Sequence, residues 1–331
     1  MSELRLNLIA KEWVIIATEH AKKPEEFRQW KEKRYLPEYL DSCPFCPGNE
    51  ATTPNEIFRV EEAGAWKIRV IPNRLAVVSD KVEGGRVNVG LRHSAIGVGR
   101  HEIIVESPIH NMSIPFLEIG DISGILKVYR DRFIEAYKDP KVEHVIIFKN
   151  QGEASGTTLQ HPHSQLIGIP VVPQDIRARI EETMRYYNTT GDCLMCATIN
   201  DELTDGKRII SATEHFVTFI PYAALSPFHT WIFPKRHMAS FADIEDSEIN
   251  DLAMALRTAL SKLHYGLDNP DFNYVIRSEG PQKNHSKHFH WYLSIVPRLS
   301  QASGFALGSG MYINPSLPEK VASFMREVRL P

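Results

Sequence analysis

An order of motifs that occurs twice limits most strongly what this chain can fold into. Each copy has a C-x-x-C pair, a strand-like stretch ending in Ile-Pro, a second strand followed by Pro and a histidine, a helical segment, another strand, and an H-x-H unit that opens a last apolar strand. The helical segments are residues 118–138 and residues 243–264, which carry apolar side chains at helical spacing. We therefore predict a duplicated domain, with copies at residues 1–180 and residues 185–331.

The succession of strands around one helix in each copy predicts an α+β fold, in which each domain is an antiparallel sheet with packed helices. We expect each domain to resemble the other in element order, although residue identity between them is low. The sequence contains neither G-x-G-x-x-G after a strand nor G-x-x-x-x-G-K-[ST]. The two common nucleotide-binding fingerprints are therefore absent from it.

The composition excludes several classes of function. Of the 331 residues, 43% are hydrophobic and 24% are charged, and the formal net charge is -3, which is the balance of an ordinary globular protein. That balance gives no electrostatic reason to expect nucleic acid as a partner, and no stretch approaches the roughly 18 apolar residues that cross a bilayer. Because the N-terminal residues also lack the apolar core of a signal peptide, we expect a cytoplasmic protein with no membrane partner.

The four cysteines fall into two C-x-x-C pairs, which argues against a framework of structural disulfides. Such a pair serves either as a metal-binding unit or as a redox dithiol at the start of a helix. Pro47 and Gly48 directly follow Cys46 and suit a turn better than a helix. We therefore favour metal at both pairs.

Each copy can supply four ligands of the kind that zinc prefers, two thiolates and two imidazoles. The first set is Cys43, Cys46, His110 and either His161 or His163, and the second is Cys193, Cys196, His237 and either His288 or His290. Four protein ligands leave no open position for an activated water, so we expect two structural Zn2+ ions per chain. The remaining histidines, His101 among them, have no such pattern and are expected to be structural or exposed.

The H-x-H unit of the first copy carries the candidate chemistry. His161 and His163 project from the same face of an extended strand, so one can close the zinc site while the other stays free. A neutral imidazole is a competent nucleophile toward an activated phosphorus centre when its second nitrogen donates to an acceptor. Gln165 lies on the same face and can donate to a phosphoryl oxygen. The alternative without catalysis is a hairpin whose polar side chains have no function in chemistry.

The stretch "FKNQGEASGTT" followed by "HPHSQ" closely resembles the active-site motif of the galactose-1-phosphate uridylyltransferase family, a branch of the histidine-triad superfamily with a duplicated domain. The stretches "SCPFCPGNE", "VIPNR", "VESPIH" and "GSGMYINPSLPE" resemble it in the same order, so the likeness covers nearly the whole chain. The resemblance implies ping-pong transfer of a nucleoside monophosphate between a nucleotide-sugar and a hexose 1-phosphate, through a covalent nucleotidyl-histidine. Family members commonly form homodimers.

Carried over by motif, the resemblance makes His163 the nucleophile, Gln165 its catalytic partner and His161 the zinc ligand. It implies the following substrate-binding residues: Lys23, Asn73, Asn150, Gly156, Thr157, Thr158, Gly304 and Phe305. For the second zinc site, aligning the closing prolines of the two H-x-H strands pairs His161 with His288. The likeness to relatives with a second C-x-x-C instead favours His290, the residue before Trp291. Aligned through their H-x-H units, the copies place Tyr292 where the first has Gln165.

Two departures from the uridylyl-transferring members bear on the substrate. Arg74 stands after Asn73 where those members commonly have Asp, and "GFALGSGMYINP" has no acidic residue where they read the hexose. This stretch and the second C-x-x-C resemble the branch with the plant ADP-glucose phosphorylases, in which inorganic phosphate accepts an adenylyl group. The hypotheses are therefore a uridylyltransferase, an ADP-glucose phosphorylase, a histidine-triad nucleotide hydrolase in which water is the acceptor, and a zinc-stabilised binding module without activity.

Overall fold

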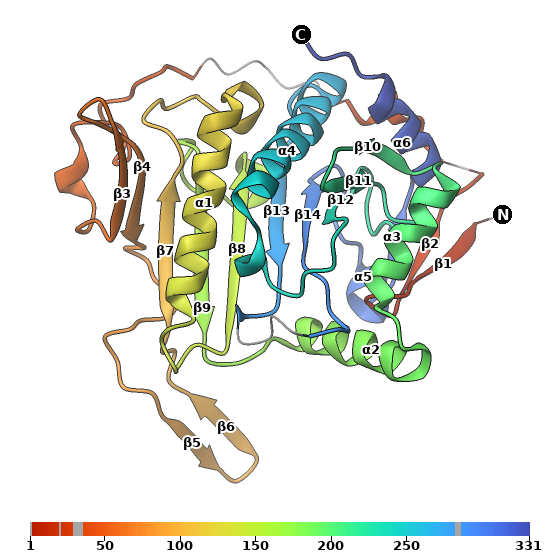
Figure 1. The fold of residues 1–331 in the computed structure, drawn as a ribbon, viewed down its shortest axis with the longest axis horizontal. Coiled ribbons are helices and arrows are strands. Elements are labelled where there is room, and N and C mark those ends of the chain that lie inside the picture. Colours follow the sequence, from red (N-terminus) through yellow and green to blue (C-terminus); the bar gives the residue numbers. More distant parts are fainter. Residues whose placement is uncertain (1, 20, 29–35, 282–285) are drawn as a thin grey trace.

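A single ten-stranded sheet forms the centre of the computed structural model, which describes residues 2–19, 21–28, 36–281 and 286–331 (Figure 1). The strand order is β3-β4-β7-β9-β8-β13-β14-β12-β11-β10, and every neighbouring pair is antiparallel. The strands are β3 (Phe58–Glu62), β4 (Ala65–Pro72), β7 (Arg100–Val105), β8 (His144–Gln151), β9 (His163–Ile169), β10 (Ile209–Ala212), β11 (Phe216–Phe219), β12 (Thr230–Pro234), β13 (Phe272–Arg277) and β14 (Tyr292–Pro297).

Each half of the sequence contributes five of these strands, and the two sets meet at β8 and β13. Asn150 lies opposite Asn273 in this central pair. The α+β class and the antiparallel sheets are confirmed, and the two sheets are continuous with each other. The domain limits at residues 180 and 185 stay a prediction.

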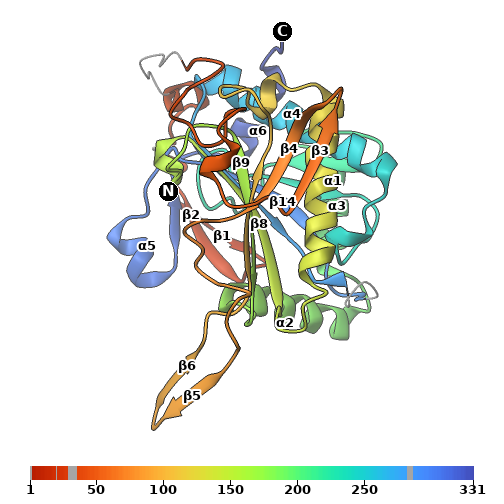
Figure 2. The ribbon, with the colours of Figure 1, turned by 90° about the vertical axis from the view of Figure 1, so that its left-hand side faces the viewer.

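Two long helices cover one face of the sheet, one from each half (Figures 1 and 2). They are α1 (Ile119–Ala136) and α4 (Asp246–Leu267), which lie within a few residues of the predicted helical segments. Their apolar side chains form the main core with the sheet residues beneath them. In α4 the capping box of Glu245 and Glu248 explains where the helix begins.

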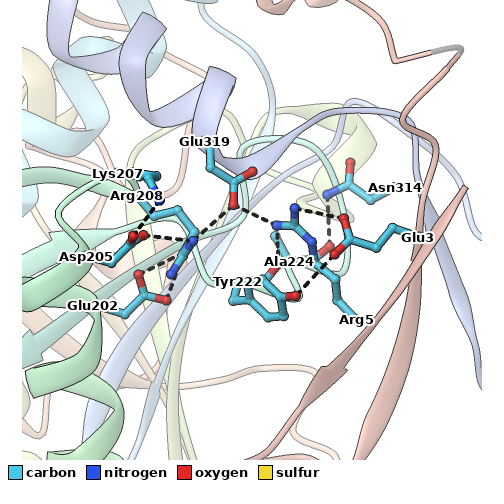
Figure 3. Close-up of polar contacts among 10 residues, drawn as sticks. All are labelled: Glu3, Arg5, Glu202, Asp205, Lys207, Arg208, Tyr222, Ala224, Asn314 and Glu319. Carbon is cyan, nitrogen blue, oxygen red and sulfur yellow. Dashed lines mark hydrogen bonds and ion pairs between the residues drawn. The ribbon is translucent and has the colours of Figure 1, made fainter.

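The N-terminal strands belong in space to the second half. β1 (Glu3–Asn7) and β2 (Glu12–Ile16) form a small sheet with β15 (Tyr312–Asn314). Figure 3 shows the ion pairs that hold this sheet: Arg5 and Arg208 both pair with Glu319, and Arg208 also pairs with Glu202. The remaining helices are α2 (Gln174–Thr190), α3 (Leu194–Asp205), α5 (Gly304–Ser309) and α6 (Pro318–Glu327), with 3-10 turns at η1 (Pro24–Phe27), η2 (Glu50–Thr52), η3 (Ile114–Phe116), η4 (Glu153–Ser155) and η5 (Phe241–Asp243).

A hairpin of β5 (Arg86–Val89) and β6 (Arg92–Ala95) projects from the body of the molecule (Figures 1 and 2). All of its strand residues are exposed. Across the part of the chain that the structure describes, no helix has the length and apolar character needed to cross a membrane.

Candidate active site and metal centres

The first C-x-x-C pair lies in a turn on the face of the sheet opposite α1, where it meets two histidines. The ligand atoms of Cys43, Cys46, His110 and His161 all lie within 4.8 Å of one another, and the four residues are buried. Cys46 Sγ is 3.5 Å from His110 Nδ1, and Cys43 Sγ is 3.6 Å from His161 Nδ1. The pair sits in turns, as the following Pro47 and Gly48 predicted.

The tautomer of His161 suits a metal ligand. Its Nε2–H donates to the carbonyl of Ser107 at 2.7 Å, which leaves the Nδ1 lone pair facing the two thiols. Burial lowers the pKa of His161 to about 4, so the ring is neutral. Burial also raises the pKa of Cys43, and a bound cation would reverse that effect by stabilising the thiolate. Two sulfurs and two neutral imidazoles are the donor set of a tetrahedral zinc site.

The second C-x-x-C pair lies at the start of α3, where Cys193 is the N-cap residue. Cys193, Cys196 and His237 place their ligand atoms within 4.8 Å of one another. Cys196 Sγ is 3.2 Å from His237 Nδ1, and His237 Nε2–H donates to the carbonyl of Ser286 at 3.0 Å. Hydrogen bonds from Cys196 and His237 lower the pKa of Cys193 to about 5. This cluster is less buried than the first, because Cys196 and His237 are partly exposed.

His290 meets the requirements of a fourth ligand, although it falls outside that group of three. Its Nε2–H donates to the carbonyl of Arg236 at 2.9 Å, and its buried Nδ1 has no hydrogen-bond partner among the described residues. The ring stacks on His237 with centroids 5.4 Å apart. His161 likewise donates Nε2–H to a backbone carbonyl in the first half, but its ring meets that of His110 edge-on. The ring of His288, in contrast, already contacts the hydroxyl of Ser286.

His163 begins β9 with its ring held for nucleophilic use. Its Nδ1–H donates to the carbonyl of His161 at 2.8 Å, so the lone pair of the neutral ring is on Nε2. Burial lowers the pKa of His163, which favours the neutral form. Phe45, the aromatic residue between the two cysteines, packs edge-on against the ring at 5.4 Å between centroids. The C-x-x-C turn therefore supports the nucleophile directly.

A fully buried ion pair lies behind His163, and sequence reasoning did not identify it. Lys149 Nζ is 2.5 Å from Glu106 Oε2 and 3.4 Å from the carbonyl of His163. The hydroxyl of Tyr129 donates to the other oxygen of Glu106 at 2.9 Å and contacts the hydroxyl of Tyr274 at 2.6 Å. The sequence around Lys149 and the sequence around Glu106 each predict a strand, but neither indicates that the two side chains pair.

Two of the predicted side chains, Gln165 and Asn73, meet beside His163, together with His101. His101 Nε2 is 2.8 Å from Gln165 Oε1, and Asn73 Nδ2 is 3.5 Å from the same oxygen. His101 is buried with its side chain in this cluster, so the expectation that it is an ordinary structural or exposed residue missed a contact to the candidate site.

The loop between β8 and β9 holds the other first-half candidates. The side chain of Asn150 contacts Asn273 of the second half. Asn273 Nδ2 donates to Asn150 Oδ1 at 2.7 Å and to the carbonyl of Ser155 at 2.9 Å. Gly156 has a positive φ of 88°. Thr157 donates to the carbonyl of Leu159, and Thr158 is exposed.

Comparison with known proteins identifies the family. A sequence model described as the N-terminal domain of galactose-1-phosphate uridyl transferase matches residues 1–173, and the model of its C-terminal domain matches residues 179–309. The chain belongs to the galactose-1-phosphate uridylyltransferase family. It is therefore an enzyme, a nucleotidyltransferase of this family.

Relatives within the family differ in their named activities. ADP-glucose phosphorylase from Arabidopsis thaliana is 35% identical over 333 residues, which cover 99% of this chain and 93% of the relative. Galactose-1-phosphate uridylyltransferase from Haemophilus influenzae is 29% identical over 294 residues, covering 87% of this chain and 81% of the relative. A crystal structure of the Arabidopsis ADP-glucose phosphorylase with bound ADP-glucose matches with a TM-score of 0.84 and 33% identity, covering 100% of both chains.

The pairing of the strands gives an alignment of the two halves of this family member, and this alignment differs from those based on the motifs. Gln165 lies opposite Ile103, and Ser294 lies opposite Trp231. His101 lies two residues before Ile103 and is 2.8 Å from Gln165. In the same way, His229 lies two residues before Trp231 and is 2.8 Å from Ser294. This alignment pairs Gln165 with Ser294 and His161 with His290. The equivalence of Tyr292 with Gln165, and that of His288 with His161, were therefore wrong, because the H-x-H units stand at different positions relative to their strands.

The second half of this family member has aromatic side chains where the first has its site. Tyr292 takes the place of His163 in that alignment, and its ring stacks on Phe233 at 4.6 Å between centroids. Trp231 and Phe219 pack against the same cluster. This face therefore keeps the cysteine–histidine cluster, and aromatic rings pack beside it.

Three residues assigned by the family resemblance lie elsewhere in this chain. Lys23 is exposed at the N-cap of η1, which packs near α4 and α6. Gly304 and Phe305 begin α5, which packs on β15 at the edge of the second half (Figures 1 and 2). No described contact joins any of the three to His163. A cleft of about 1150 Å³ between β1 and α3 also lies apart from the site, because none of the predicted site residues lines it.

Proposed function

We propose that this chain transfers the nucleotidyl group of a nucleotide-sugar to a phosphate acceptor through a covalent bond to His163. The observation that carries the proposal is the state of the His163 ring, in which Nδ1–H is bound to the carbonyl of His161 at 2.8 Å. That bond leaves the lone pair on Nε2. It also stabilises the positive charge that develops on the ring when Nε2 forms a bond to phosphorus.

The two half-reactions balance without any added reagent. In the first, Nε2 attacks the α-phosphorus, a P–N bond forms, and the bond from that phosphorus to the bridging oxygen breaks with loss of a sugar 1-phosphate. In the second, an oxygen of the acceptor attacks the same phosphorus, the P–N bond breaks, and His163 returns to its neutral form. Donors aimed at the phosphoryl oxygens lower the barrier of both steps. Gln165 and Asn150 are our candidates for this role.

The donor that we propose is an ADP-sugar, with inorganic phosphate as the acceptor. The support is the 35% identity over 99% of the chain with a plant ADP-glucose phosphorylase, together with Arg74 after Asn73 and the absence of an acidic residue from residues 304–315. Uridylyl transfer to a hexose 1-phosphate is the second candidate, because relatives named galactose-1-phosphate uridylyltransferase also match most of the chain.

Zinc is the metal that we propose for both cysteine–histidine clusters. Cys43, Cys46, His110 and His161 would hold one ion, and Cys193, Cys196, His237 and His290 the other. Bound metal would supply a rigid charged anchor for the loops and no reacting group, since protein side chains fill all four positions. Elemental analysis tests this assignment directly, with two zinc ions per chain expected.

A homodimer is the assembly that we propose. The outer face of the β1-β2-β15 sheet supports it, because Leu4, Trp13 and Ile313 point outward there and are 55%, 47% and 46% exposed. Contiguous apolar faces of this kind mark interaction surfaces. Gly304 and Phe305 lie near this sheet and away from His163 of the same chain. Sedimentation at several protein concentrations measures the mass of the assembly.

The mass of the trapped covalent adduct tests the reaction. The protein is incubated with ADP-glucose or UDP-glucose without acceptor, quenched, and measured intact. An adenylyl adduct supports the phosphorylase, and a uridylyl adduct supports the second candidate. His163→Ala should form no adduct and keep its metal content. Nucleoside monophosphate release that needs no acceptor would instead indicate a hydrolase, and a loss of about half the zinc in His163→Ala would exchange the roles of His161 and His163.

A further inference from the structure

His101 contacts Gln165 with one ring nitrogen and the backbone with the other. It is 8% exposed at the beginning of β7. The backbone N–H of Val77 donates to His101 Nδ1 at 3.2 Å, and His101 Nε2 is 2.8 Å from Gln165 Oε1. Both ring nitrogens therefore have partners within the protein, and neither is available to a substrate.

The contact with Val77 decides the tautomer of His101. A backbone N–H can only donate, so Nδ1 must accept and the proton of the neutral ring must be on Nε2. Burial lowers the pKa of His101 and favours this neutral ring. Nε2–H then donates to Gln165, and the atom that receives this bond must be the amide oxygen.

Asn73 reinforces the same orientation of Gln165. The backbone N–H of Leu75 donates to Asn73 Oδ1 at 2.9 Å, so the NH2 group of Asn73 faces the opposite way, where it lies 2.9 Å from His101 Nε2 and 3.5 Å from Gln165 Oε1. Because His101 Nε2 carries the ring proton, the acceptor for this NH2 group is Gln165 Oε1. Two donors thus face the amide oxygen of Gln165. The NH2 group of Gln165 has no hydrogen-bond partner among the described residues and is free to donate.

We propose that His101 is a positioning residue that keeps the NH2 group of Gln165 directed toward the phosphoryl group carried by His163. The proposal rests on the function proposed above. Gln165 follows His163 by two residues in β9, so both side chains project from one face of the strand. An amide presents either a donor or an acceptor to a phosphoryl oxygen, and only the donor stabilises the negative charge of the transition state. Without His101, the amide can turn its oxygen toward the phosphate.

The second half has an equivalent contact with the opposite direction, because His229 Nε2 accepts from the indole N–H of Trp231 at 3.1 Å and the serine hydroxyl beside it must therefore donate. His229 Nε2 lies 2.8 Å from the hydroxyl of Ser294, at the place that strand register assigns to Gln165. Ser294 is shorter and is buried. The place of the histidine is therefore repeated in the two halves, whereas its Nε2 donates in the first half and accepts in the second. A purely structural role for His101 is the alternative that an experiment must exclude.

The matched variants His101→Gln and His101→Asn separate these roles. A glutamine amide can reach the position of Nε2 and restore a donor to Gln165, whereas an asparagine amide reaches only the position of Nδ1. We expect His101→Ala and His101→Asn to slow single-turnover adduct formation roughly ten- to hundredfold at saturating nucleotide-sugar, because one donor to a developing phosphoryl charge is worth about that much or more. His101→Gln should recover most of this rate. His93→Ala, in the exposed β6 strand, is the control.

Combination with Gln165→Ala gives the deciding measurement. If His101 acts only through Gln165, then His101→Ala has no further effect on the adduct rate once Gln165 is alanine. Equal losses in both backgrounds would overturn the proposal, and so would a wild-type rate in His101→Ala or a loss in His101→Gln as large as that in His101→Ala. If the wild-type protein forms no adduct at His163, the proposed function itself has failed, which the same mass measurement shows separately.

Discussion

Lys149 and Glu106 are charged residues with fully buried side chains, directly behind the backbone of the proposed nucleophile. Removing one member of such a pair leaves the other charge unpaired in a medium of low dielectric constant. We expect Lys149→Met to lower the free energy of unfolding by about 3–5 kcal/mol. The double variant Lys149→Met with Glu106→Gln should recover part of this loss. Urea denaturation of the metal-loaded protein measures both.

A surface ion pair provides the control for this prediction. Lys127 pairs with Asp246 at 2.9 Å, but their side chains are 44% and 64% exposed. Lys127→Met should therefore cost no more than about 1 kcal/mol. Equal losses in Lys149→Met and Lys127→Met would contradict the importance of the buried pair.

Strand geometry predicted that His161 and His163 lie on one face of a strand, and the resemblance of the motif "HPHSQ" to the family assigned them their separate roles. Their hydrogen bonds are consistent with those roles. Neither Lys149 nor His101 could be assigned in this way. Their partners, Glu106 and Gln165, are distant in the sequence, and only strand pairing brings them together.

At the scale of elements, the loop from β8 to η4 depends on the backbone of Gly152. This residue has a φ of +83°, and a Cβ there would lie 1.9 Å from Asp271 Oδ1. Gly152→Ala must therefore both adopt an unfavourable backbone conformation and displace Asp271. We expect a loss of well over about 1 kcal/mol in unfolding free energy and a clear fall in adduct formation, measured by denaturation and by intact mass.

Gly156 is the matched control in the same loop. Its φ of +88° and ψ of 16° lie in the left-handed helical region, which is less unfavourable for alanine than the φ of +83° and ψ of 160° of Gly152, and no atom lies within 4 Å of the added Cβ. Gly156→Ala should therefore cost only the backbone term of about 1–2 kcal/mol. A loss as large as that in Gly152→Ala would contradict the expectation that the backbone region of Gly152 and its contact with Asp271 add to the cost.

If the two cysteine–histidine clusters bind zinc as proposed, they should release it at different rates. All four residues of the first cluster are buried, whereas Cys196 and His237 of the second are partly exposed. After addition of a chelator we expect two phases, the faster from the second cluster, followed with a chromogenic zinc indicator. Cys193→Ser should remove the faster phase and Cys43→Ser the slower one. A single phase in the wild-type protein would contradict this difference.

Helices α1 and α4 were predictable because each buries one apolar stripe that repeats at helical spacing. The helix of the second C-x-x-C pair was not. The first pair is followed by Pro47 and Gly48, which favour a turn, but the second is followed by residues that continue into α3. The two pairs therefore supply the same kinds of side chain from different backbone structures, a turn in the first half and the start of a helix in the second.

The whole molecule joins its two halves through the central pair of β8 and β13, a feature that the motif repeat could not reveal. The repeat predicts two similar sheets, but pairing between their edges depends on contacts more than a hundred residues apart. The position of β1 and β2 beside the second half also depends on a pairing between distant parts of the sequence, because β2 pairs with β15 in parallel. Local patterns carry no information on such pairings.

The pairing of β8 with β13 brings residues of the second half into contact with the candidate site of the first half. Asn273 fixes the amide oxygen of Asn150 at 2.7 Å and the carbonyl of Ser155 at 2.9 Å, and Asp271 accepts from the backbone N–H of Ala154 at 2.8 Å. The NH2 group of Asn150 is then directed away from Asn273, as the NH2 group of Gln165 is directed away from His101. Both candidate phosphate donors are thus oriented by residues that do not themselves react.

We expect Asn273→Ala to slow nucleotidyl transfer roughly tenfold, because each lost hydrogen bond is worth about 1 kcal/mol. Asn273→Asp should fare no better, since a carboxylate cannot donate to Asn150 or to the carbonyl of Ser155. Asn200→Ala, on the exposed face of α3, is the control within the same half. Turnover is measured with each variant at matched metal content. An unchanged rate in Asn273→Ala would show that the loop keeps its shape without the second half, and the two halves would then share a sheet but not a site.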